Sequence, residues 1–83
     1  MRDRLHTLYV GGLPPAMDSA ALGALFESFG QLAAARVVMR PSTNTCRGFG
    51  YVTFLTAQAA ELARRALDGQ SIAGLRLRVA PAP

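Results

Sequence analysis

The residues of this chain whose types and spacing suit a chemical role are three aromatic residues and a set of arginines. Phe49 and Tyr51 alternate with other residues in the segment 47–54, RGFGYVTF, and Tyr9 lies between two aliphatic residues near the start of the chain. Aromatic rings stack on flat π-faces such as those of nucleobases. The planar guanidinium fork of arginine binds phosphate oxygens bidentately and also stacks on rings. Together these residue types predict recognition of a nucleic acid.

The charge of the whole chain points to the same class of partner. Nine basic residues oppose five acidic ones in 83 residues, which gives a net charge of +4. A basic chain attracts polyanions. All the basic residues are arginine, and this exclusive use has a second interpretation, a G+C-rich coding sequence, which the base composition of the gene would test.

The sequence offers no set of groups for catalysis. It has one histidine, one cysteine and scattered carboxylates, without an acid–base or nucleophile–base pair at a recognisable spacing. Its glycines form neither a G-x-G-x-x-G nor a Walker pattern. The single cysteine, Cys46, excludes an internal disulfide and a multi-cysteine metal site, and we interpret it as a small loop residue. We therefore expect a binding domain that is not an enzyme and uses no cofactor or metal.

The elements that must position the rings can be predicted from local patterns. Asp18 or Ser19 would cap a first helix that ends at Gly30, and Thr56 would cap a second helix over residues 57–67. Four segments have the β-branched, aromatic or alternating composition of strands: residues 7–10, 34–40, 48–55 and 75–80.

The resulting order, β-α-β-β-α-β, matches the ferredoxin-like arrangement of the α+β class. In this fold a four-stranded antiparallel sheet carries two helices on one face, which leaves the other face open to solvent or to a ligand. Because a chain of 83 residues has room for one core, we expect a single domain over residues 1–83 with its core at about 6–80. Gly50, on the core side of the third strand, would let a helix pack closely.

Strand alternation assigns the rings to that open face. Successive side chains of a strand point to opposite faces, so a buried Leu8 and a buried Val52 send Tyr9 and Tyr51 outward. An exposed cluster of rings needs a partner to cover it, and single-stranded bases do so at ~1–3 kcal/mol per base. The same alternation places further residues on the open face: Arg36 and Val38 in the second strand, Arg47, Phe49 and Thr53 in the third, and Arg76 and Arg78 in the last.

The ring-bearing segments resemble the two signature sequences of the RNA recognition motif. Residues 47–54, RGFGYVTF, are similar to the octapeptide signature, [K/R]-G-[F/Y]-[G/A]-F-V-x-[F/Y]. Tyr51 stands where the signature has phenylalanine, so one aromatic ring replaces another. Residues 8–13, LYVGGL, resemble the hexapeptide signature on the first strand, and ALDGQSIAGLRLRV resembles the usual C-terminal part. The resemblance extends over the whole chain and implies the ferredoxin-like fold.

This resemblance also implies roles for individual residues. Tyr9 and Phe49 are expected to stack on two successive bases, and Tyr51 to lie against the sugars or between them. Arg47 is expected to contact phosphate. Gly12 stands where the family often has asparagine, so any contact from that side chain is missing. Further contacts are expected from four arginines of the sheet face and the neighbouring loop: Arg36, Arg40, Arg76 and Arg78.

The expected partner is single-stranded RNA, bound by an intracellular, monomeric domain. Single-stranded DNA is an alternative, because stacking does not distinguish the two sugars. A second alternative is a protein-interaction module on the same fold, which would bind a peptide through its helices or through a modified sheet. We expect neither a membrane nor a small-molecule partner, because the longest uncharged stretches are too short to span a bilayer.

Overall fold

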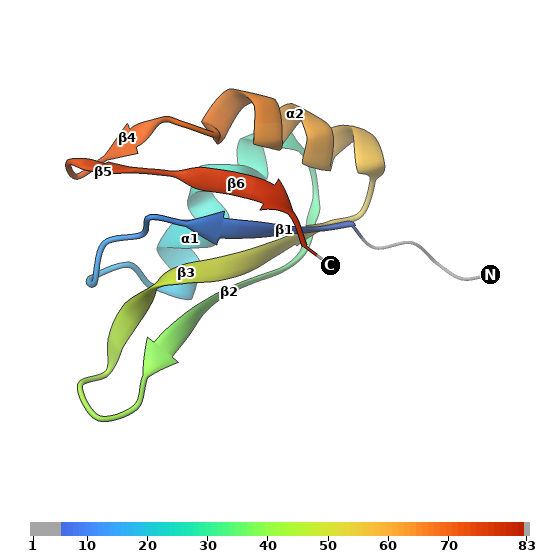
Figure 1. Ribbon diagram of the computed structural model, residues 1–83. Helices are drawn as coiled ribbons and strands as arrows, with labels where there is room; N and C mark the ends of the chain where they lie inside the picture. Colours follow the sequence, from blue (N-terminus) through green and yellow to red (C-terminus); the bar gives the residue numbers. More distant parts are fainter. Residues whose placement is uncertain (1–5, 83) are drawn as a thin grey trace.

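The computed structural model describes residues 6–82 of the chain, which form a sheet with two helices packed on one face (Figure 1). Strands β2, β3, β1 and β6, in that spatial order, make an antiparallel sheet. This arrangement confirms the predicted ferredoxin-like α+β fold. No helix among residues 6–82 is both long and apolar enough to cross a membrane. The elements follow one another as β1 (His6–Gly11), α1 (Ser19–Phe26), the 3-10 turn η1 (Glu27–Phe29), β2 (Leu32–Arg40), β3 (Thr45–Phe54), α2 (Ala57–Leu67), β4 (Ser71–Ile72), β5 (Leu75–Arg76) and β6 (Arg78–Pro81).

The core lies between the sheet and the helices, and the alternation of the two central strands supplies much of it. Leu8 and Val10 of β1 and Val52 and Phe54 of β3 are buried, as the strand period requires. The ring of Phe54 meets that of Phe26 from α1 at 6.3 Å between centroids. Because every second side chain of β1 and β3 is used in this way, the intervening ones must face away from the helices.

Both helices begin at the predicted caps. The Asp18 carboxylate accepts a hydrogen bond from the backbone N–H of Ala21 at 2.8 Å, and the Thr56 hydroxyl accepts one from the N–H of Ala59 at 3.1 Å. Each cap satisfies a backbone donor that the helix leaves unpaired, which stabilises a helix by about 1 kcal/mol. The first helix tightens into η1 for its last turn before Gly30.

The predicted last strand, 75–80, is wrong in one respect, because the chain breaks it at Leu77. The backbone N–H of Leu77 donates to Gln70, and its carbonyl accepts from Gly69. With Leu77 fully buried, its backbone is paired to the end of α2 and not to β1. The segment before it, β5, turns back on β4 as a separate hairpin, and only β6 joins the large sheet.

The interpretation of Cys46 as a loop residue is also wrong. Strand β3 begins at Thr45, and Cys46 is a buried member of the core. Its backbone N–H donates to the carbonyl of Pro15 at 3.0 Å, and its sulfur accepts from the N–H of Gly48 at 3.3 Å. The strand begins three residues before the predicted start, because Cys46 and Thr45 pair with Met39 and Arg40 of β2.

Candidate nucleic-acid interface

Tyr9, Phe49 and Tyr51 form one cluster on the face of the sheet that the helices leave open. The Tyr9 and Phe49 rings lie 5.9 Å apart between centroids and are inclined by only 28°. Tyr51 stands edge-on to both, at 6.1 Å from Tyr9 and 6.2 Å from Phe49. Edge-to-face pairs contribute about 0.5–1.5 kcal/mol beyond their buried area, so the cluster holds its shape while each ring stays partly exposed.

Strand register sets the order of side chains across this face. Tyr51 pairs with Tyr9 on one side and with Arg36 on the other, so these three form a row across β2, β3 and β1. In the next row Gly11 lies between Phe49 of β3 and Arg78 of β6. Directly paired residues have their side chains on the same face. The first row therefore combines two rings with Arg36 at one end, and the second combines one ring with Arg78.

The glycine pair after Tyr9 is explained by two close approaches. A β-carbon on Gly11 would lie 2.7 Å from the hydroxyl and 3.0 Å from Cε1 of Tyr9, which means that the phenol end of that ring covers Gly11. Gly12 has φ of +78°, and a β-carbon there would run into the carbonyl oxygen of Arg76. An asparagine at position 12 would thus have to displace the β5 backbone from the end of β1.

We expect the change Gly11→Ala to weaken RNA binding while the domain stays folded. The three atoms nearest to the added methyl group all belong to the outer end of the Tyr9 ring, at 2.7–3.1 Å, so the ring has to move and its position in the cluster is lost. The loss should be smaller than the ~1–3 kcal/mol that removing a stacking ring costs. Fluorescence anisotropy with a labelled single-stranded RNA measures it. In the control Gly23→Ala the new β-carbon makes an ordinary 3.5 Å contact behind the sheet, and equal losses in both variants would contradict the account.

Within residues 6–82, the arginines of the open face and its loops form no salt bridge with a carboxylate. Arg36, Arg40, Arg47, Arg76 and Arg78 are all exposed, and the salt bridges within residues 6–82 do not involve any of them. The four carboxylates of the same region belong to the helical layer or its ends: Asp18, Glu27, Glu61 and Asp68. The positive charge is therefore concentrated on one side of the molecule.

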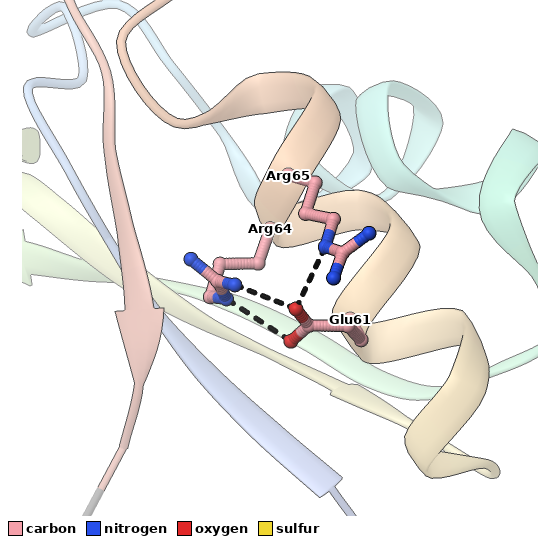
Figure 2. Close-up of polar contacts among 3 residues, drawn as sticks. All are labelled: Glu61, Arg64 and Arg65. Atoms are coloured by element: carbon pink, nitrogen blue, oxygen red, sulfur yellow. Dashed lines mark hydrogen bonds and ion pairs between the residues drawn. The ribbon is translucent and has the colours of Figure 1, made fainter.

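By contrast, Arg64 and Arg65 on α2 are already paired with a carboxylate of the same helix. Figure 2 shows both guanidinium groups directed at the carboxylate of Glu61, with nitrogen–oxygen distances of 2.6 Å from Arg64 and 3.0 Å from Arg65. The hydrogen bond from Arg64 holds the pKa of Glu61 below its usual value, and Arg65 acts in the same direction. These two arginines add nothing to the open face.

Arg47 projects from an irregular part of β3. Val37 of β2 pairs with Gly50 of β3, and the next pair is Met39 with Cys46. Strand β3 therefore uses four residues where β2 uses two, and it bulges around Gly48, whose φ is +101°. The carbonyl of Gly48 accepts the N–H of Leu13 at 2.9 Å, which ties the bulge to the loop after β1. Bulges redirect side chains at functional surfaces, and this one lies between Arg47 and Phe49 in the strand.

The structure brings most of the predicted residues together, but not all in the predicted way. Tyr9, Phe49, Tyr51, Arg36 and Arg78 share the open face in register. The remaining three lie around it: Arg47 on the bulge, Arg40 at the end of β2, and Arg76 in the β4–β5 hairpin.

Sequence reasoning missed a polar contact on the same face. The hydroxyl of Thr7 in β1 lies 2.9 Å from the hydroxyl of Thr53 in β3, and the two residues are direct partners in the sheet. Strand alternation had assigned Thr53 to the open face, and counting back two residues from Tyr9 would have added Thr7.

Comparison with known proteins agrees with this geometry. The family model of the RNA recognition motif matches residues 8–78. The 29 kDa ribonucleoprotein B, chloroplastic, of Nicotiana sylvestris is 42% identical over 78 residues, which cover 92% of this chain and 27% of that protein. Glycine-rich RNA-binding protein 3, mitochondrial, of Arabidopsis thaliana is 38% identical over 72 residues, covering 87% of this chain and 23% of that protein. The chain thus spans about a quarter of the length of these curated relatives.

A solved structure is similar over nearly the whole fold. The RNA recognition domains 1 and 2 of sex-lethal from Drosophila melanogaster superpose with a TM-score of 0.89 at 28% identity, covering 94% of this chain and 50% of that one. The family model, over residues 8–78, includes Tyr9 of β1 and the whole of β3.

Proposed function

Because the chain belongs to the RNA recognition motif family, we propose that it binds single-stranded RNA on the open face of its sheet. The observation that carries this proposal is the cluster of Tyr9, Phe49 and Tyr51, whose centroids lie 5.9–6.2 Å apart. The same face bears arginines that form no salt bridge within residues 6–82. The family is one of binding domains in ribonucleoproteins and not of enzymes, as the lack of a catalytic set in the sequence predicted.

Tyr9 and Phe49 each stack on one base in this proposal. Their rings are the pair with the smallest inclination, 28°, so two successive bases can lie on them with similar orientation. Tyr51, edge-on to both, lies against the sugars between the two bases. Duplexes are poor ligands because their bases are already stacked on one another and are hidden from a flat sheet.

The arginines supply the second part of the affinity. Arg47 binds a phosphate beside Phe49, and Arg36, Arg40, Arg76 and Arg78 attract the backbone on either side of the rings. Neutralised phosphates release condensed counterions, so the affinity falls as salt rises. The carboxylates of residues 6–82 lie in the helical layer or at its ends, so this part of the chain places no negative charge on the sheet face.

Binding titrations also test two other classes of ligand, single-stranded DNA and peptides. Equal affinity for an RNA and for the DNA of the same sequence would make the domain a general single-strand binder. A peptide partner that perturbs α1 and α2, with no response to any oligonucleotide, would replace the proposal by the protein-interaction function. The name of the Arabidopsis relative, an RNA-binding protein, supports RNA.

For Arg47→Ala we expect a shallower salt dependence of RNA binding. If Arg47 neutralises one phosphate of a single strand, the negative slope of the logarithm of the association constant against the logarithm of the salt concentration should become shallower by about 0.7. Titrations at several salt concentrations measure that slope. The control Arg65→Ala removes an equal charge that lies on α2 and is paired with Glu61, and it should leave the slope unchanged; an equal change in both variants would mean that only the total charge matters.

A further inference from the structure

A groove of about 300 Å³ lies between α2 and the neighbouring strands β1 and β6. The strands supply an apolar floor that includes Leu8 and Pro81, which are direct partners in the sheet. The helix supplies a wall that includes Ala57, Ala60 and Arg64. The volume is at the lower end of the range of small-ligand sites, ~300–1,000 Å³. This space, called the α2 groove below, therefore suits one large side chain.

The α2 groove exists because the helix face above the strands is built from small residues. Positions three and four apart lie on one face of a helix, and here Ala57 and Ala60 occupy two of them. Leu8 beneath them is buried. An alanine offers only a methyl group above this floor, whereas a leucine at the same position would fill the space.

Arg64 places a cation with unused donors on the rim of the groove. Its Nε and Nη2 atoms donate to Glu61 at 3.1 and 2.6 Å, whereas Nη1 forms no hydrogen bond within residues 6–82. Glu61 also lines the groove, but its carboxylate is shared with Arg65, which approaches it from a different side (Figure 2). Asp68 attracts Arg64 as well and does not line the groove. Because hydrogen bonds between ionised groups are stronger than neutral ones, Nη1 favours a carboxylate as its ligand.

The edge strand β6 adds a backbone acceptor. Residues two apart in a strand direct their backbone groups to the same side. The N–H of Ala82 donates to Thr7 of β1, and the N–H of Val79 donates to the side chain of Asp68. The carbonyl of Pro81, two residues after Val79, therefore points away from β1. Since Pro81 lines the groove, its carbonyl can accept an N–H from a ligand there.

We propose that the α2 groove binds an acidic peptide segment of a partner protein, which inserts one large apolar side chain. That side chain contacts Leu8, Ala57 and Ala60. A neighbouring carboxylate binds Nη1 of Arg64, and a peptide N–H donates to the carbonyl of Pro81. A small apolar acid would use the floor and the cation only. The inference goes beyond RNA binding and does not depend on it, because the groove includes no residue of the ring cluster and no arginine of the open face.

Two pools of blocked hexapeptides are the probes. Each peptide has one central leucine, isoleucine, phenylalanine or methionine, flanked by aspartate and glycine in the acidic pool and by lysine and glycine in the basic pool. Backbone amide and alanine methyl shifts of the labelled domain are followed during titration with each pool. The acidic pool should shift the signals of Leu8, Ala57 and Ala60, and the basic pool should not. Isovalerate, an apolar acid without a peptide group, should bind more weakly than the acidic pool.

Two pairs of variants test the place of binding. Ala57 and Ala66 are both exposed alanines of α2, and only Ala57 lines the groove. Ala57→Leu should weaken binding of the acidic pool about 10-fold or more, because the burial of one large apolar side chain is lost, and Ala66→Leu should bind like the wild type. Arg64→Ala should weaken it about 3- to 10-fold, the range of a partly exposed charge-assisted hydrogen bond. Arg65→Ala, which removes the other partner of Glu61, should have no effect. Urea denaturation verifies that each variant is folded.

Glu61→Gln should act in the opposite direction. It removes the negative charge from the groove and releases Nε and Nη2 of Arg64, so the acidic pool should bind about 2- to 5-fold more tightly. A role of Glu61 and Arg64 confined to the stability of the helix would give no gain in peptide affinity.

Several results would overturn the inference. These are an acidic pool that leaves Leu8 and Ala60 unshifted, equal binding of the basic pool or of isovalerate, and equal losses in Ala57→Leu and Ala66→Leu. Displacement of the acidic pool from these positions by a single-stranded RNA would assign the groove to nucleic acid instead. Phe49→Ala separates the two proposals, because it should lose RNA affinity and keep the peptide affinity of the wild type. Either function can therefore fail while the other stands.

Discussion

Replacing Tyr9 and Phe49 with alanine is expected to abolish most of the affinity for single-stranded RNA. Each stacked base contributes ~1–3 kcal/mol, so each single change should weaken binding by about 5- to 150-fold. The two rings are neighbours at 5.9 Å, and residues in contact rarely act independently. The effect of the double variant should therefore differ from the product of the single effects.

Titration of a fluorescent RNA with each variant measures these losses, and Leu62→Ala is the matched control. Leu62 is a large apolar residue that is 51% exposed on α2, so its truncation removes a similar apolar surface on the helical side. Its affinity should equal that of the wild type. Unchanged affinity in both ring variants, with the fold intact, would contradict stacking as the source of binding.

The second large effect concerns stability and uses a residue of the same type in the same strand. Phe54→Ala is expected to destabilise the domain by ~3–5 kcal/mol, the usual cost of deleting a buried phenyl ring. Phe54 is fully buried against Phe26. The free energy of unfolding of a native domain is only ~5–15 kcal/mol, so this loss is a large part of it. Urea denaturation followed by circular dichroism measures the loss.

Phe49→Ala is the matched counterpart of Phe54→Ala. Phe49 lies five residues earlier in β3, on the opposite face and partly exposed. It should lose RNA affinity with little loss of stability, whereas Phe54→Ala should lose stability first. The assignment of the two sheet faces would be wrong if the two variants had the opposite effects, or if both were destabilised equally.

The sequence was sufficient to predict the ring cluster because the relevant strands alternate without interruption. From Gly50 to Phe54 every second residue of β3 is buried, and β1 pairs with it residue by residue. The caps at Asp18 and Thr56 were also predictable, because they depend on local hydrogen bonds within one turn of the helix.

The break at Leu77 was not predictable from alternation alone. The segment LRLRVA keeps a strict two-residue period through the break, and Leu77 and Val79 are both buried as that period requires. What ends the strand is tertiary, since the backbone of Leu77 bonds to Gln70 and Gly69. The hairpin before it turns through Ala73, whose φ of +52° is a conformation that alanine rarely adopts.

Cys46 was misassigned for a related reason. A short polar stretch, Ser42 to Thr45, precedes it and predicts a loop. Its place in β3 comes from pairing with Met39, and its backbone N–H donates to the distant Pro15. The bulge at Gly48 likewise needs both partner strands to be known. Local patterns thus predicted the faces of the sheet, and long-range backbone contacts decided where its strands begin and end.

The central claim is that RNA lies across β1 and β3 on the open face. Its most direct test is a map of backbone amide chemical shifts of the labelled domain during titration with a single-stranded RNA. The largest changes are expected at Tyr9, Phe49 and Tyr51 and around Arg47, and the outer surface of α2 around Leu62 and Arg65 should be unchanged. Changes confined to α1 and α2, with those ring-bearing positions unaffected, would contradict it.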